Sequence, residues 1–276
     1  LYRAKVRLLA RRCDAFLVSF PKCGRTWLRM MLGSALSEHY GISVRNLRRF
    51  TDADVTHPGL PRVLATHDDS PQVKSPHRVM RDKRAYRHSK VVLLTRDPRD
   101  AIVSLYFHVT RRRQVPYDGD LSAFVRERSG GLASLLAFYD AWAPHLDRDN
   151  VLLVRYEDMH AAPARELERV LTFLDVSGVE DAVVERAVTA SSFERLQRME
   201  REGSAGTRAL RTTTTHDPEA YKVRRGKVGG YVDYLSASDI AAVDAAVSRS
   251  VGARALGYVT ASDGGTHADD HDTDHS

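Results

Sequence analysis

The stretch Phe16-Leu-Val-Ser-Phe-Pro-Lys-Cys-Gly-Arg-Thr-Trp27 decides how this chain folds. Its apolar run breaks at Pro21 and Gly24 and passes into a helical pattern from Trp27 to Leu36. This order predicts a strand, a glycine turn and the start of a helix. The first backbone N–H groups of a helix have no partner within the helix and lie at the positive end of its dipole. Together with Lys22, they predict a site for a phosphate-like anion.

The loop differs from the nucleotide-binding pattern G-x-x-x-x-G-K-[ST], which this sequence lacks. Taken alone, it is also compatible with an ordinary strand-to-helix turn that carries an exposed lysine. Other elements of the chain have to decide between the two.

A second strand candidate, Val91-Val-Leu-Leu-Thr95, leads into Arg96-Asp-Pro-Arg-Asp100 and a helical pattern from Ala101 to Arg113. Asp97 suits the N-cap and Pro98 the first helical position. Ser104 shares a helix face with Asp97 and Asp100, so its hydroxyl lies near Arg96. A guanidinium and a hydroxyl then converge at a second helix N-terminus, although a solvated cap with a surface arginine fits equally well.

A third element, Arg224-Arg-Gly-Lys-Val-Gly-Gly230, combines three cations with three glycines. Backbone N–H groups freed by glycine and adjacent guanidiniums form a nest that closes over an anion. The alternative is a flexible basic linker.

In this order, the three elements resemble the sulfotransferase family that uses 3′-phosphoadenosine 5′-phosphosulfate (PAPS). The first loop is similar to the family's Pro-Lys-Ser-Gly-Thr-Thr-Trp, Arg96 with Ser104 to its 3′-phosphate element, and Arg224-Arg-Gly226 with Gly229 to its late glycine loop. Lesser matches are Thr66-His67, Arg155-Tyr-Glu-Asp158 and Ser191-Ser-Phe-Glu194. The resemblance spans about residues 15–258.

The chain departs from the family pattern at three positions. Cys23 and Arg25 replace a serine and a threonine of the loop, and Ala65 stands where animal members carry a lysine before Thr-His. We therefore hypothesise that Arg25 supplies the sulfate contact of the missing lysine.

The resemblance implies a set of site residues and a metal-free transfer that uses PAPS as co-substrate. Lys22 would neutralise the leaving group, His67 would take the acceptor proton, and Ser104 completes the catalytic set. The 3′-phosphate would be held by Arg96, Ser104, Arg224 and Arg225. Trp27 and Phe193 would be apolar plates for adenine, with ordinary core packing as the alternative. The cofactor-binding set is Lys22, Cys23, Gly24, Arg25, Thr26, Trp27, Arg96, Ser104, Tyr156, Ser191, Phe193, Arg224, Arg225 and Gly226.

Apolar strand candidates at 15–20, 62–66, 90–95 and 150–156 alternate with amphipathic helical stretches. Alternation of this kind predicts an α/β fold with a central parallel sheet and helices on both faces, and with ligands at the carboxyl ends of the strands. The resemblance specifies the P-loop nucleotide-kinase-like sulfotransferase fold. We expect residues 1–261 to form a single domain and 262–276 a disordered acidic and histidine-containing tail.

Composition narrows the class of protein and its compartment. The net charge of +6 includes the tail's five aspartates, so the remaining body is more basic still and suits a polyanionic ligand. Two cysteines are too few for a disulfide framework and favour a reducing, cytoplasmic location. Cys23, beside Lys22 at a helix start, is expected to be the more reactive thiolate. No apolar stretch is long enough to predict a membrane span.

Two other functions are alternatives to sulfuryl transfer. A nucleic-acid-binding protein would use the arginines of 45–49 and 111–113, but no recognition motif accompanies them. A phosphoryl-transfer enzyme on the same sheet would need a Mg²⁺-binding Ser or Thr after the loop lysine and an acidic partner at a strand end. Neither is evident, since Gly24 does not follow the nucleotide pattern and Asp68-Asp69 lies beyond His67.

The resemblance implies that the acceptor is a hydroxyl or amine on a small molecule or glycan. Segments 44–60, 68–77 and 105–130 are expected to line its pocket, and their polar composition favours a polar acceptor such as a sugar. The segment from Gln197 to Lys222 is expected to form a lid that orders when the cofactor product, adenosine 3′,5′-bisphosphate (PAP), binds.

Overall fold

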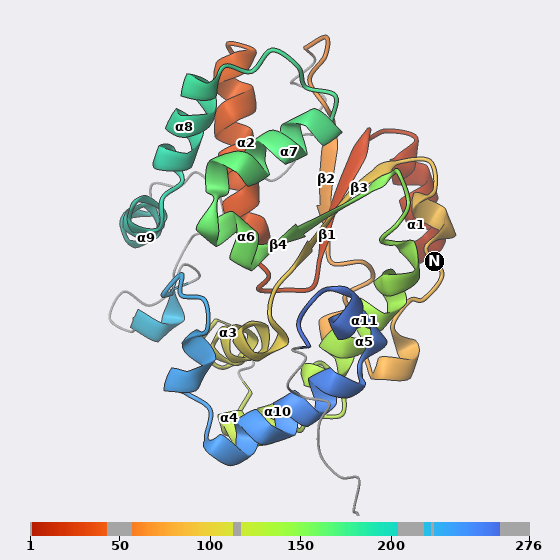
Figure 1. Cartoon of the computed structure of the whole chain (residues 1–276), viewed down its shortest axis with the longest axis vertical. Coiled ribbons are helices and arrows are strands. Elements are labelled where there is room, and N and C mark those ends of the chain that lie inside the picture. The colour runs from red at the N-terminus through yellow and green to blue at the C-terminus, as the bar shows by residue number, and fades with distance from the viewer. Residues whose placement is uncertain (1, 43–56, 113–116, 204–217, 222–223, 260–276) are drawn as a thin grey trace, which may run out of the picture.

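A computed structural model describes residues 2–42, 57–112, 117–203, 218–221 and 224–259 of the chain. Its centre is a parallel sheet in the order β2-β1-β3-β4 (Figure 1). The strands are β1 (Ala15–Ser19), β2 (Val63–Thr66), β3 (Lys90–Thr95) and β4 (Val151–Arg155). All four strand predictions are confirmed to within one residue at each end. They succeed because parallel strands covered on both faces are continuous apolar runs.

The helices and 3₁₀ turns between and after the strands, in chain order, are α1 (Tyr2–Ala10), α2 (Arg25–His39), η1 (Pro71–Val73), η2 (Pro76–Arg78), η3 (Arg84–Tyr86), α3 (Pro98–Arg111), α4 (Leu121–Val125), α5 (Leu132–Trp142), η4 (Ala143–His145), α6 (Tyr156–Ala161), α7 (Pro163–Phe173), α8 (Asp181–Ala190), α9 (Phe193–Glu202), η6 (Pro218–Ala220), η7 (Gly230–Asp233), α10 (Ala237–Arg249) and α11 (Val251–Ala255). None of the helices in the described ranges combines the length and apolar composition that crossing a bilayer requires.

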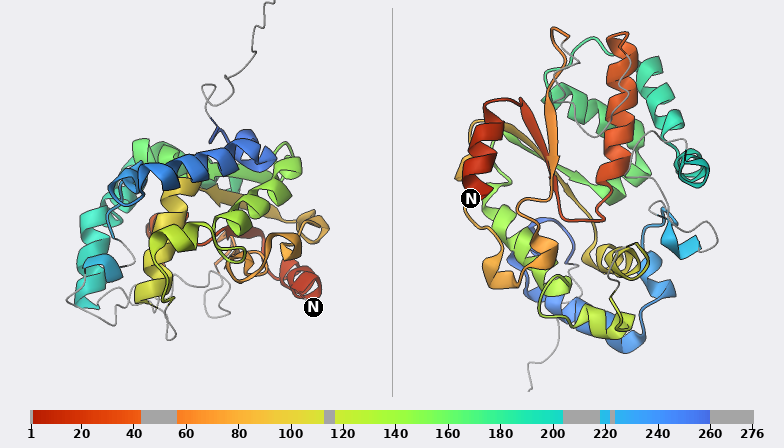
Figure 2. Two further views of the ribbon diagram at one scale, coloured as in Figure 1. Left: turned by 90° about the horizontal axis from the view of Figure 1, so that it is seen from below. Right: turned by 180° about the vertical axis from the view of Figure 1, so that it is seen from behind.

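Helices cover both faces of the sheet. On one side α2 contacts α7 and α8, and on the other α5 contacts α3, α10 and α11. Figures 1 and 2 show these two groups on opposite sides of the strands. All five residues of β1 are buried, and so are those of β3 after Lys90, because these two strands lie inside the sheet. The predicted α/β architecture with a doubly covered parallel sheet is confirmed.

The turn after β2 is strained and held by a buried network. Asp68, Asp69 and Ser70 all have positive φ, at 53°, 69° and 54°, which costs free energy for residues with a Cβ. The Asp68 carboxylate is fully buried and pairs with the ammonium of Lys83. It also accepts hydrogen bonds from Tyr86 Oη at 2.7 Å and from Trp142 Nε1 at 3.0 Å. These bonds fix the turn directly behind His67.

Candidate functional site

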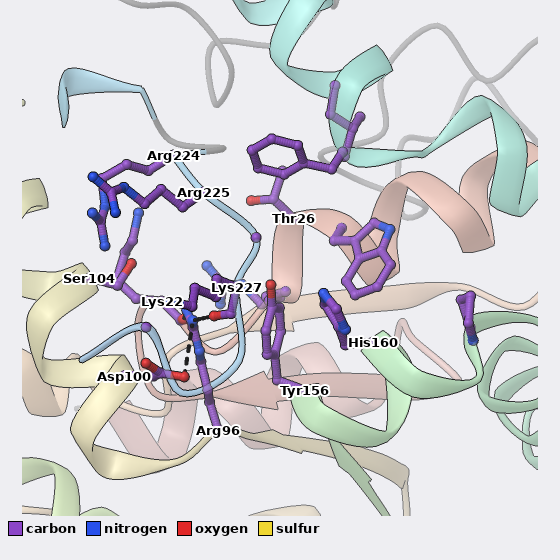
Figure 3. A pocket seen from close by; sticks show the side chains of 18 of the residues that line it. Lys22, Thr26, Arg96, Asp100, Ser104, Tyr156, His160, Arg224, Arg225 and Lys227 are labelled. Atoms are coloured by element: carbon purple, nitrogen blue, oxygen red, sulfur yellow. Dashed lines mark hydrogen bonds and ion pairs between the residues drawn. The ribbon is translucent and has the colours of Figure 1, made fainter. Parts of the chain in front are cut away.

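A cavity of about 580 Å³ opens at the carboxyl ends of the strands (Figure 3). Its walls come from the loop after β1, the ends of β2 and β3, helices α3 and α6, the α8–α9 region and the late glycine loop. Most sequence-predicted site residues line it, namely Lys22, Gly24, Arg25, Thr26, Trp27, His67, Arg96, Ser104, Tyr156, Phe193, Arg224, Arg225 and Gly226. Cys23 and Ser191 do not.

The first loop has an irregular backbone that ends at the start of α2. Gly24 is the N-cap of α2 with φ 89°, and no side chain caps the amides that follow it. Lys22 also has a positive φ, of 72°. A Cβ added at Gly24 would lie 2.6 Å from Cδ2 of Tyr156, so the ring packs directly on the glycine. The uncapped helix start and Lys22 thus lie together at the place where the sequence predicts an anion site.

The prediction that Cys23 is a reactive thiolate is wrong. Its side chain is fully buried, and its Sγ lies 3.8 Å from the Tyr139 hydroxyl. Burial raises the pKa of this thiol to about 12. The thiol belongs to the core beneath the loop, so only the backbone of Cys23 is placed to meet a ligand.

Arg96 joins the first loop to the late one. Its Nη1 donates to the Lys22 carbonyl at 3.3 Å, and its Nη2 donates to the Lys227 carbonyl at 3.1 Å. The guanidinium lies over the Tyr156 ring, 4.2 Å from its centroid, as Figure 3 shows. At the start of α3, the predicted cap is confirmed, since Asp97 accepts from the Arg99 amide and Pro98 is the first helical residue.

Asp100 is a site residue that the sequence reasoning missed. Its buried carboxylate accepts hydrogen bonds from the amides of Gly229 at 2.8 Å and Tyr231 at 2.9 Å. It also lies 3.7 Å from Nη2 of Arg96. Asp100 thus fastens the late loop to α3. Its position four residues after Arg96, in the first turn of the predicted helix, was the available signal.

The cations of the late loop are paired with carboxylates. Arg224 donates to Glu219 at 2.8 Å, and its guanidinium lies 4.5 Å from the Phe107 ring centroid. Arg225 is about half exposed and donates to Asp233 at 3.2 Å. Gly226 has φ 62°, and a Cβ there would lie 2.6 Å from Cδ2 of Phe193. The loop is therefore tethered by charge and by one ring contact.

Aromatic rings form the opposite side of the cavity. Trp27 meets Tyr156 edge-on at 5.8 Å and the His160 ring at 6.5 Å. His160 was missed, although it follows Tyr156 by one turn of α6 and shares its face. Ser191 is buried outside the lining, while Ser192 lines the cavity and caps α9 by accepting from the Arg195 amide. The serine that lines the cavity is therefore Ser192 and not the predicted Ser191.

His67 is held between the sheet and the first loop. Its Nδ1 lies 2.9 Å from the Ser19 carbonyl oxygen. Its Nε2 lies 2.6 Å from Nη2 of Arg25. The residue expected to act as base and the residue expected to bind sulfate are thus in direct contact.

The structure describes only parts of the segments that were predicted to form the acceptor pocket and the lid. Segment 44–60 and the predicted lid at 197–222 lie largely outside the described residues, although 197–202 are part of α9. Segment 105–130 gives His108 to the cavity. Segment 68–77 gives none of its residues, because Asp68 is used in the buried network behind His67. Within the described ranges, no group of His, Cys, Asp or Glu could hold a metal ion.

Comparison with known proteins points to one family. The sulfotransferase domain model matches residues 12–254. Cytosolic sulfotransferase 17 of Arabidopsis thaliana is 27% identical over 272 residues, which cover 88% of this chain and 76% of that protein. Sulfotransferase 6B1 of Pan troglodytes is 27% identical over 180 residues, with coverages of 60% and 56%.

Solved structures share the fold. Mouse sulfotransferase SULT7A1 complexed with PAP superposes with a TM-score of 0.62 at 20% identity, covering 92% of each chain. Retinol dehydratase in complex with androsterone and inactive cofactor PAP gives a TM-score of 0.64 at 16% identity, covering 86% of this chain and 80% of that one.

Proposed function

This chain belongs to the sulfotransferase domain family, and on that premise we propose that it moves a sulfuryl group from PAPS to a hydroxyl or amine of a polar acceptor. The observation that carries the proposal is the arrangement of cations in one cavity. Lys22 and the uncapped start of α2 lie at one place, and Arg96 with Ser104 lies at a second. Rings of Trp27 and Tyr156 line the same space. A nucleotide with a phosphate at each end fits this pattern.

Unsatisfied polar atoms support the fit of that ligand. Nη1 of Arg25, Nε1 of Trp27 and Nε of Arg96 are buried and have no hydrogen-bond partner among the described residues. A buried donor without a partner is costly unless a ligand completes it. At Gly24 and Gly226 the absence of a Cβ lets the Tyr156 and Phe193 rings pack directly against the two loops.

We assign the residues by their place in the cavity. Lys22 and the amides of residues 24–26 would hold the 5′ end of the donor. Arg96, Ser104 and Arg225 would hold the 3′-phosphate, and Trp27, Tyr156 and Phe193 would enclose the base. Arg224 supports the loop through Glu219 and Phe107. When bound, the donor supplies an activated sulfuryl group.

The chain's own groups then have three tasks. They align acceptor and donor, remove the acceptor proton and neutralise the charge that grows on the leaving oxygen. His67 Nε2 is the proposed proton acceptor, since Nδ1 is engaged with the sheet. Lys22 is the proposed cation for the leaving oxygen, because it lies in the loop that receives the 5′ end.

A polar acceptor is supported by polar side chains of the cavity other than the proposed donor ligands. His108 and Tyr234 line the cavity together with His67, whereas its aliphatic members, Val188 and Leu196, come from α8 and from α9, the helix that begins at Phe193. The aliphatic contacts thus lie at the proposed adenine site. The cytoplasmic location stays a prediction from the two free, buried cysteines.

Calorimetry and turnover test the proposal. PAP should bind more tightly than 5′-AMP, because only PAP carries the 3′-phosphate, and ADP with Mg²⁺ should not compete. The parent protein with PAPS should sulfate members of a sugar and amino-sugar panel. A His67→Ala variant should bind PAP as the parent does and lose roughly 10²–10⁴ in rate. Equal affinity for PAP and AMP, or a preference for ADP with Mg²⁺, would contradict the proposal.

A further inference from the structure

Arg25 is the first residue of α2 and reaches across the cavity to the end of β2. An arginine has only donors, so in the 2.6 Å contact Nη2 donates and His67 Nε2 accepts. The Ser19 carbonyl can only accept, so Nδ1 of His67 carries the ring proton and donates to it at 2.9 Å. The hydrogen-bond network therefore assigns a neutral imidazole whose lone pair is occupied by Arg25.

The other side of the guanidinium is unsatisfied. Nη1 of Arg25 is buried and has no hydrogen-bond partner among the described residues. Burial, aided by the charge of Arg29, lowers the pKa of Arg25 to about 10, so the group stays charged at neutral pH. A buried cation bonded only to a neutral ring is incompletely compensated. Such a group is poised to bind an anion.

We propose that Arg25 is a catalytic residue whose guanidinium occupies the base in the resting enzyme and turns to the sulfuryl oxygens when PAPS binds, which frees His67 Nε2 for the acceptor. This inference rests on the proposed function. It assigns the coupling between donor binding and base release to a residue at which the chain departs from its family's usual loop.

The guanidinium should leave His67 for the sulfuryl group because the two groups differ in strength as hydrogen-bond acceptors. A bond from a guanidinium to an anionic oxygen is roughly twice as strong as one to a neutral acceptor. The planar fork of Arg25 can use both terminal nitrogens on sulfuryl oxygens, and so satisfies Nη1 as well. The released Nε2 then takes the acceptor proton as the acceptor oxygen bonds to sulfur, while the sulfur–oxygen bond to the bisphosphate breaks with its electron pair on the bisphosphate.

Nitrogen-15 NMR of the histidines tests the release directly. In the free protein, His67 should show the Nδ1–H tautomer with an Nε2 shift altered by the Arg25 hydrogen bond. PAPS without acceptor should move the Nε2 signal, whereas PAP, which lacks the sulfuryl group, should leave it in place. An identical response to both ligands, or to neither, would overturn the proposal.

Variants at Arg25 supply the second test. Arg25→Met should bind PAP within about twofold of the parent and lose roughly 10²–10³ in turnover, as for one lost transition-state donor. Arg25→Lys should recover part of that loss. A lysine ammonium keeps the positive charge next to the sulfuryl oxygens but lacks the planar fork of two donors. Arg186→Met is the control, since Arg186 is an exposed arginine of α8 that pairs with Glu38 outside the cavity lining and should leave turnover unchanged.

Unfolding midpoints of all variants show whether a loss reflects folding. A folded Arg25→Met variant with parental turnover would overturn the role of Arg25 while sulfuryl transfer by the parent stands. Absence of PAP binding by the parent would instead remove the proposed function. The two failures are thus separable.

Discussion

The first loop (residues 21–27) and the late loop (residues 224–230) both place a ring on a left-handed glycine, yet they are held in different ways. Beneath the first loop lie Cys23 and Leu28, which are fully buried, so its shape follows from the core. The late loop is held by hydrogen bonds to Asp100 and by ion pairs of its cations. We infer that the first loop is preorganised for chemistry, whereas the late loop contributes affinity and responds to charge.

The largest effect expected from this contrast is the loss of turnover when Lys22 is substituted. Lys22→Met removes a charge whose value grows as the leaving group departs, so turnover should fall roughly 10²–10³ while PAP affinity changes much less. Arg225→Met, in the late loop, should weaken PAP binding and leave turnover at saturation near that of the parent. Single-turnover rates and calorimetry measure both. A Lys22→Met enzyme with half the parental rate would break the contrast.

A smaller effect is expected on stability when each glycine is replaced by alanine. Both changes force a Cβ into a left-handed backbone, which costs about 1–2 kcal/mol. Gly24→Ala should lose a further ~1–3 kcal/mol, because the buried Tyr156 ring cannot withdraw from a Cβ at 2.6 Å. Gly226→Ala should avoid that addition, since its loop can shift. Denaturant unfolding gives both free energies, and equal losses would contradict the inferred difference in rigidity.

Asp100 should control the late loop alone. Asp100→Asn removes the charge that receives two backbone N–H groups, so hydrogen exchange of the Gly229 and Tyr231 amides should speed up about tenfold, which corresponds to ~1.4 kcal/mol. Amides of the first loop should keep their protection. Asp233→Asn is the control, because Asp233 pairs with side chains of the same loop. Faster exchange in both loops would show that they open together.

The smallest effect is expected in thiol labelling, where the native protein should not react. Cys23 is fully buried and its thiol has a pKa of about 12, so a thiol reagent at pH 8 should leave it unmodified in the native protein. Cys13, whose burial raises its thiol pKa to about 11, should behave alike. Both should react in denaturant. Stoichiometric labelling of native Cys23 would mean that the first loop opens readily.

The sequence predicted the strands, the two glycine loops and half of the cavity lining. These features are local, because apolar runs, caps and glycines act over a few neighbouring residues. Features that depend on tertiary neighbours were missed. The burial of Cys23 depends on Tyr139. The role of Asp100 depends on the amides of Gly229 and Tyr231, which follow it by 129 and 131 residues in the sequence. The shift from Ser191 to Ser192 is a matter of helix start, which pattern reading places only within a few residues.

The two tryptophans of the chain lie in different environments and give the protein its own optical probes. Trp27 lines the cavity, so its emission will respond to a nucleotide that contacts it. Trp142 is sealed in the core, where it bonds to Asp68 beneath the ammonium of Lys83, 4.8 Å from its ring centroid. Its emission will be a steady internal reference as long as the strained turn behind His67 is intact. One fluorescence spectrum of the unlabelled protein thus reads occupancy and the integrity of that turn through two separate chromophores.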